Sequence, residues 1–100
     1  MKGLISDLNK AFDHKVRLGI MSVLVTKNES DFNGLKSILG VTDGNLASHV
    51  KALEKENYLE VIKQFIGRKP NTKYLVTKEG KQAFKKHLDA LEALISNSNN

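Results

Sequence analysis

The chain contains no cysteine and a single proline among its 100 residues. The lack of cysteine excludes a disulfide framework, thiolate metal sites and a cysteine nucleophile. It also suits an ordinary cytoplasmic protein, so we expect a cytoplasmic location. No apolar run reaches the length of a membrane span, and charges interrupt the N-terminal stretch MKGLISDLNKAFDHK. We therefore expect neither membrane association nor a secretory leader.

Signatures of catalysis are missing as well. The sequence shows no glycine-rich phosphate loop, no nucleophile motif and no catalytic pair of acids. His14 and His87 have no carboxylate or second histidine at ligand spacing, so we expect no metal site. The prediction is a protein that is not an enzyme and that carries no cofactor.

Acidic residues are scarce in one part of the chain. The whole chain has a net charge of +5, but the segment 63–86 holds eight Lys and Arg residues against Glu79 alone. A local field of that sign favours an anionic partner. Charge alone does not name that partner, because a lysine-rich soluble surface explains it equally well.

The apolar residues follow helical spacing through most of the chain. The length and the 40% hydrophobic content suit one domain, 1–100, with a modest core that dimerisation would stabilise. Spacing predicts amphipathic helices at 3–13, 15–27, 32–39, 42–57 and 78–96. The helix 15–27 is apolar on more than one side, which is typical of a helix buried between other elements.

Residues at the predicted helix ends have capping chemistry. Ser30 or Asp31, Thr42 and Thr77 are the expected N-caps, and Gly40 is the expected left-handed residue that closes helix 32–39. Between the last two helices, 59–66 and 72–77 are rich in β-branched and aromatic residues. Turn residues at 67–71 separate them, which predicts a β-hairpin with a five-residue loop.

The stretch 41–59, VTDGNLASHVKALEKENYL, has two dissimilar sides. One side is the apolar stripe Leu46, Val50 and Leu53. The opposite side is small, polar and weakly basic, with Gly44, Ser48, Lys51 and Lys55. A tight turn and a second helix with such a face are typical of a helix-turn-helix, and a basic hairpin directly after it strengthens that interpretation.

Three motifs carry a family resemblance: NLASHVKALE at 45–54, Tyr58-Leu59, and GRKPNTKYLVTKEG at 67–80. Over about residues 9–90 the chain resembles the short winged helix-turn-helix regulators of the ArsR/MarR superfamily. The resemblance implies a mainly α fold with a small β-hairpin wing. The helix-turn-helix would span about 32–57, the wing 59–77, and dimerisation helices 3–13 and 78–96. Metal-sensing members generally use cysteines, so metal sensing is not implied here.

The expected function is sequence-specific binding of double-stranded DNA by a dimeric regulator, a repressor. Helix 42–57 would enter the major groove, where Asn45 can pair with adenine, and the wing at 67–71 would reach the adjacent minor groove or backbone. Lysines on the helix would bind phosphates without reading sequence. The expected DNA contacts are Thr42, Gly44, Asn45, Ser48, His49, Lys51, Lys55, Arg68, Lys69 and Lys73.

Several of these residues have a second interpretation. Asp43 could accept from cytosine N4, or it could simply be a favourable acid in the first turn of a helix. His49 could bind a phosphate or lie at the edge of the core. Arg68 could be an exposed turn charge without a ligand.

The terminal helices supply the expected homodimer interface through two apolar stripes. These are Leu4, Leu8 and Phe12, and Phe84, Leu88, Leu91 and Ile95. The alternative is that both stripes cover the core of a single chain. An alternative function is a winged-helix module that binds protein rather than DNA, since fold does not dictate function. The sequence identifies no effector and no operator.

Overall fold

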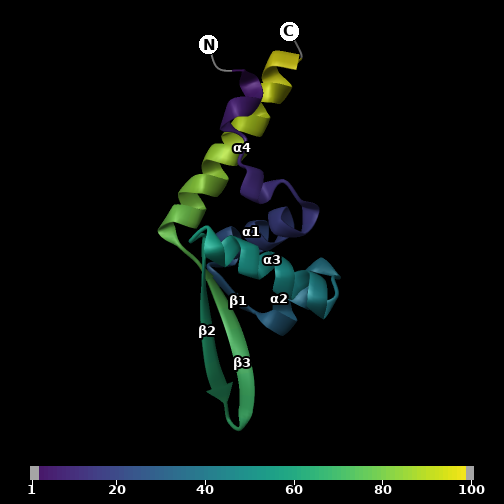
Figure 1. The fold of residues 1–100 in the computed structure, drawn as a ribbon, viewed down its shortest axis with the longest axis vertical. Coiled ribbons are helices and arrows are strands. Elements are labelled where there is room, and N and C mark those ends of the chain that lie inside the picture. Colours follow the sequence, from purple (N-terminus) through teal and green to yellow (C-terminus); the bar gives the residue numbers. More distant parts are fainter. Residues whose placement is uncertain (1–2, 99–100) are drawn as a thin grey trace.

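The protein is elongated, with helical elements at one end and a β-hairpin at the other. The computed structural model describes residues 3–98, and the molecule measures 57 × 25 × 21 Å along its principal axes. Figure 1 shows the C-terminal helix beside the N-terminal segment at one end and a β-hairpin at the other, with shorter helices between them. The elements are η1 (Leu4–Asp7), η2 (Lys10–Phe12), α1 (Lys15–Lys27), β1 (Glu29–Asp31), α2 (Phe32–Leu39), α3 (Asp43–Lys55), β2 (Leu59–Ile66), β3 (Lys69–Val76) and α4 (Lys78–Ser98).

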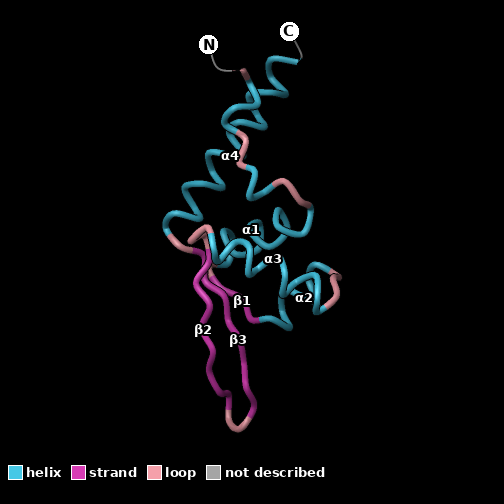
Figure 2. Tube along the Cα trace, in the orientation of Figure 1, coloured by secondary structure: helices cyan, strands magenta, loops and turns pink. Residues whose placement is uncertain are grey.

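This architecture confirms the predicted fold class, mainly α with a hairpin wing. In Figure 2 the hairpin β2–β3 projects away from the helices as a long, narrow ribbon. Helices α1, α2, α3 and α4 form where the apolar spacing predicted helices. Within residues 3–98, no helix combines the length and the apolar character that crossing a membrane requires.

Helix α1 is the centre of the core. It contacts α2, α3, α4, β1 and β3, which confirms the prediction of a helix buried between other elements. The fully buried side chains come from four elements and make one continuous apolar cluster. They are Phe12, Ile20, Met21, Leu24, Leu35, Leu46 and Leu53.

Side-chain caps begin the helices that carry the candidate site. Asp31 caps α2, Thr42 caps α3 and Thr77 caps α4, each accepting from the backbone N–H three residues later at 2.7, 3.2 and 2.8 Å. Gly40 ends α2 in the left-handed conformation, with φ at 64°. These contacts confirm the expected caps and identify Asp31, rather than Ser30, as the cap of α2.

A short strand that the sequence did not predict completes the sheet. β1 pairs antiparallel with β3, so the strand order is β1-β3-β2. Glu29 lies opposite Leu75, and Asp31 lies opposite Lys73. A three-residue polar strand has no periodicity to detect, because its stabilisation comes from hydrogen bonds to a strand far along the chain.

The hairpin turn is tighter than the sequence predicted, so the expected five-residue loop is wrong. Ile66 pairs directly with Lys69, which leaves Gly67 and Arg68 as the two turn residues. Gly67 has a φ of 64°, a conformation that favours glycine. Pro70 lies in β3 beyond the residues that pair with β1. Its lack of an N–H therefore removes no hydrogen bond to β1.

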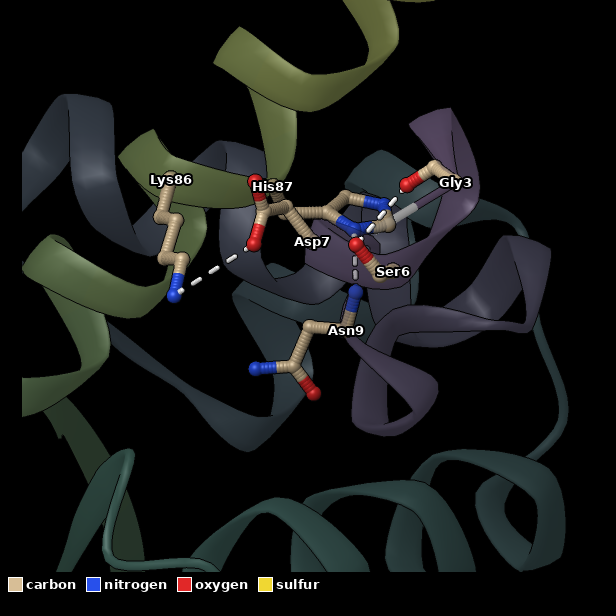
Figure 3. Close-up of polar contacts among 6 residues, drawn as sticks. All are labelled: Gly3, Ser6, Asp7, Asn9, Lys86 and His87. Carbon is tan, nitrogen blue, oxygen red and sulfur yellow. Dashed lines mark hydrogen bonds and ion pairs between the residues drawn. The ribbon is translucent and has the colours of Figure 1, made fainter. Parts of the chain in front are cut away.

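The predicted helix 3–13 is also wrong. The segment forms two short 3₁₀ helices, η1 and η2, separated by extended backbone at Leu8 and Asn9. The Asn9 backbone N–H donates to Nδ1 of His87 at 2.9 Å, and its side-chain oxygen caps η2 by accepting from Ala11. Figure 3 shows the contact between Asn9 and His87 of α4. These two hydrogen bonds hold Asn9 in an extended conformation that interrupts a continuous helix.

Phe12 and Phe84 do not belong to a dimer surface, which corrects two of the predicted interface residues. Phe12 is 0% exposed and Phe84 is 4% exposed within a single chain. The Phe12 ring lies 5.3 Å from the rings of Tyr58, Phe84 and His87. For these two residues, the alternative of a single-chain core is correct.

Substitution of Gly80 is expected to destabilise the fold. A Cβ atom at Gly80 would collide with the backbone carbonyl of Tyr58, which already accepts a hydrogen bond from the Thr77 N–H. Backbone cannot rotate aside as a side chain can, so α4 would have to shift. We expect Gly80→Ala to lower the unfolding free energy by about 2 kcal/mol, seen as a fall in Tm of roughly 10 °C.

Gly44 is the matched control, because it also lies in the first turn of a helix. A Cβ there would meet nothing within 4 Å. Gly44→Ala is expected to leave stability unchanged or to raise it by up to about 1 kcal/mol, because alanine is the better helix former. Equal Tm values for the two variants would show that the close approach at Gly80 is unimportant.

Candidate nucleic-acid interface

Helix α3 presents its small, polar side to solvent. Leu46, Val50 and Leu53 are buried against the core, as the apolar stripe predicted. The opposite side is exposed, and the open space around Gly44 leaves room for another surface to approach the backbone closely. Its exposed residues include Thr42, Gly44, Asn45, Ser48, Lys51 and Lys55.

Asp43 forms an ion pair between the two helices of the helix-turn-helix. Its carboxylate lies 2.8 Å from the Lys36 ammonium of α2, and it occupies the first turn of α3. The pair is largely exposed, so its contribution to stability is small. Both observations favour the interpretation of Asp43 as a helix-start acid over a base-reading role. The contact with Lys36 crosses a turn and leaves no periodic signal in the sequence.

His49 lies in a cluster with two residues that the sequence did not connect to it. Its Nδ1 accepts from Nε of Arg17 at 3.0 Å, and its ring lies 4.1 Å from the ring of His14. Burial, and then the charges of His14 and Arg17, lower the pKa of His49. The imidazole is therefore neutral at pH 7 and is already bonded through one nitrogen. This arrangement favours the core-edge interpretation over a cationic phosphate contact.

Six of the eight basic residues of segment 63–86 differ in whether they form ion pairs. Lys73 lies 3.4 Å from Glu29, Lys85 2.9 Å from Asp89, and Lys86 3.8 Å from Asp7. By contrast, the basic residues in the outer half of the hairpin form no ion pair with any residue in 3–98. These are Lys63, Arg68 and Lys69, and all three are exposed.

The ion pair of Lys73 separates it from the other predicted DNA contacts. Its side chain is only 27% exposed, and it lies opposite Asp31 on one neighbouring strand and Ile62 on the other. The structure thus places Lys73 halfway along the hairpin, where β1 joins the sheet, beside acidic residues. Arg68 and Lys69, in contrast, lie at the free end (Figure 1).

A chain of side-chain hydrogen bonds links the hairpin to α2. Gln64 donates to Asn71 at 3.0 Å, and Asn71 donates to one carboxylate oxygen of Asp31 at 3.3 Å. The other oxygen of Asp31 accepts from the N–H of Gly34 and so caps α2. These bonds restrict the direction of the hairpin relative to the helix-turn-helix. The sequence predicted either Ser30 or Asp31 as the cap and did not show the second role of Asp31.

The remaining histidine is structural. His87 is 6% exposed, it accepts from the Asn9 N–H, and its ring packs on Phe12. Burial lowers the pKa of His87, against a smaller raising effect of Asp13. Across residues 3–98, no group of three or more His, Cys, Asp or Glu residues is arranged to hold a metal ion.

Comparison with known proteins gives this geometry a context. Residues 16–95 match the family described as winged helix DNA-binding domain. An uncharacterised protein of Methanocaldococcus jannaschii is 35% identical over 88 residues, which cover 88% of this chain and 96% of that protein.

Two solved structures are similar to the fold. A transcriptional regulator homologue from Pyrococcus horikoshii superimposes with a TM-score of 0.86 at 29% identity, covering 97% of this chain and 94% of that one. AbfR, known from Staphylococcus epidermidis, has been solved bound to DNA in its overoxidised form. That complex gives a TM-score of 0.73 at 17% identity, covering 91% of this chain and 66% of that one. At this identity the second likeness concerns the fold alone.

Proposed function

Because the chain belongs to the winged helix DNA-binding domain family, we propose that it is a dimeric repressor that binds a specific sequence in double-stranded DNA. One observation carries the proposal. The exposed polar side of α3 and the unpaired cations of the hairpin tip are two separate surfaces of one domain. The first suits the base edges of a groove, and the second suits the phosphates that flank it.

Helix α3 supplies the contacts with bases. A single α-helix fits the major groove of B-DNA, where each base pair displays a distinct pattern of donors and acceptors. The first turns of a recognition helix reach the base edges, and here they expose Asn45 and Ser48 beside the unobstructed Gly44. Lys51 and Lys55 lie further along the exposed side and would bind phosphates.

The hairpin supplies the flanking contact. Arg68 and Lys69 are exposed at its free end, and arginine is favoured where the minor groove is narrow and its negative potential is strong. The bonds from Gln64 through Asn71 to Asp31 support a defined wing direction. A wing held in this way loses little conformational entropy on binding.

The exposed apolar residues of the terminal elements favour a homodimer. Leu4 is 51%, Leu88 46%, Leu91 36% and Ile95 64% exposed, and Leu8 is half-buried. They belong to η1, its C-cap Leu8 and α4, which lie away from the hairpin tip (Figure 1). A second copy would cover this surface and pair two α3 helices for half-sites separated by about one DNA turn. Such a dimer on its operator would repress transcription by occluding the promoter.

Arg68→Ala tests the proposal through the salt dependence of binding. We expect the variant to bind a selected duplex about tenfold more weakly, because one charged hydrogen bond is lost. The slope of log K against log salt should fall by about 1 if that contact is to a phosphate. Fluorescence anisotropy over a range of salt concentrations measures both quantities.

Lys86→Ala is the matched control for the change in charge. Its ammonium is on α4, away from the hairpin tip, and its side chain is 70% exposed. This variant should leave the slope close to that of the unaltered protein. If the unaltered protein shows no salt-dependent binding to any duplex at low micromolar concentration, the proposal is wrong.

A further inference from the structure

The tip of the hairpin carries two large apolar side chains in open solvent. Phe65 is 73% exposed and Ile66 is 61% exposed, and they are the last two residues of β2. Both directly precede the turn formed by Gly67 and Arg68. These two adjacent apolar side chains at the end of a projecting hairpin form a candidate interaction site.

The register shows why the core does not cover these residues. Residues paired across strands share a face, so Phe65 and Pro70 lie on the same face as the buried Leu59 and Tyr74. That face is packed at the base of the hairpin and becomes bare where the strands extend past the helices (Figure 2). Ile66 points to the other face, opposite Lys69. The tip is therefore apolar on both of its faces.

The charges around the tip identify the kind of partner. Arg68 and Lys69 are exposed and form no ion pair with any other residue of 3–98, so their field attracts an anion. Pro70 stiffens the strand that returns from the turn by restricting its backbone. A rigid, narrow element with cations at its end and apolar side chains behind them complements a groove lined by phosphates with stacked bases beneath.

We propose that Phe65, with Ile66 beside it, is an apolar wedge that enters the minor groove behind Arg68 and partly unstacks one base step. Apolar side chains inserted in this way kink the duplex toward the major groove. The inference rests on the proposed DNA binding and deepens it. It adds specificity at a position away from α3, because pyrimidine–purine steps are the easiest to kink.

The experiment uses the full chain and a 40-base-pair duplex recovered by selection from a randomised library. Single adenines on the wing side are replaced by 2-aminopurine, whose fluorescence rises when it is unstacked, and dyes at the two ends report bending by energy transfer. We expect the unaltered protein to raise the fluorescence at one step and to bring the ends closer together. Phe65→Ala should abolish both signals and weaken binding about tenfold, whereas Phe65→Leu should retain them.

Ile38→Ala is the matched control, because Ile38 is an exposed apolar residue, 52% exposed, on α2 rather than on the hairpin. It should leave all three signals unchanged, and thermal melting should show that every variant is folded.

Binding without unstacking, or unstacking that survives Phe65→Ala, would overturn the wedge while leaving DNA binding intact. Absence of duplex binding by the unaltered protein would overturn the proposed function itself. Sedimentation with phosphatidylglycerol vesicles that depends on Phe65, with DNA binding that does not, would instead identify a membrane contact and refute the wedge.

Discussion

Replacing Phe12 with alanine is expected to lower the free energy of unfolding by about 3–5 kcal/mol. The ring is fully buried and contacts the rings of Tyr58, Phe84 and His87, so its removal leaves a cavity bordered by three rigid groups. A loss of that size is a large fraction of the stability of a small domain. Urea denaturation followed by circular dichroism measures it as a shift of the midpoint.

Leu4→Ala is the control for this prediction, since Leu4 comes from the same predicted stripe but is 51% exposed. Its effect on single-chain stability should be below about 1 kcal/mol, as is usual for surface positions. If Phe12→Ala changed the association state of the protein but not the stability of the chain, the assignment of Phe12 to the core would be wrong.

Asn45→Ala is expected to weaken binding to the selected operator by roughly 5- to 150-fold, which corresponds to about 1–3 kcal/mol for a bidentate pair with adenine. The backbone N–H of Asn45 already donates to the Thr42 cap, so the substitution leaves the start of α3 intact. Within residues 3–98 no group hydrogen-bonds the Asn45 amide side chain, which is exposed and available to a base. A binding-site selection with the variant should lose its adenine preference at one position and retain the others.

Asn97→Ala provides the same chemical change at the far end of the molecule. Asn97 lies near the C-terminal end of α4, where it donates to the carbonyl of Ala93. This variant should select the same DNA motif with the same affinity as the unaltered protein. A uniform loss of affinity for all sequences with Asn45→Ala would instead make Asn45 a phosphate contact and not a base reader.

The elements that the sequence predicted well depend on contacts within a few residues. Helices α1, α2 and α3 follow from apolar spacing, and the caps Asp31, Thr42 and Thr77 each bond the third residue onward. The exposed side of α3 follows from the same spacing, because burying one stripe leaves the opposite one in solvent. Each of these features depends on an interaction between residues that are close together in the sequence.

The contacts of the candidate-site residues could not be predicted from such short stretches of sequence. The sequence placed Arg68 and Lys69 at a basic turn, but it did not separate them from Lys73, whose partner Glu29 lies on another strand. It likewise placed His49 on the flank of a helix without showing that Arg17 bonds it. The side chains were identifiable from local pattern, whereas their partners were not.

The remaining features of the fold depend on contacts between residues that are far apart in the sequence. Strand β1 exists because it pairs with β3, and the helix predicted at 3–13 is interrupted because the N–H of Asn9 bonds His87, 78 residues away. Phe12 and Phe84 have the same spacing as their exposed neighbours and entered the core only because η2 packs against α4 there. Periodicity shows which side of a helix is apolar. Only the folded chain determines whether that side meets the core of its own molecule or is left for another surface.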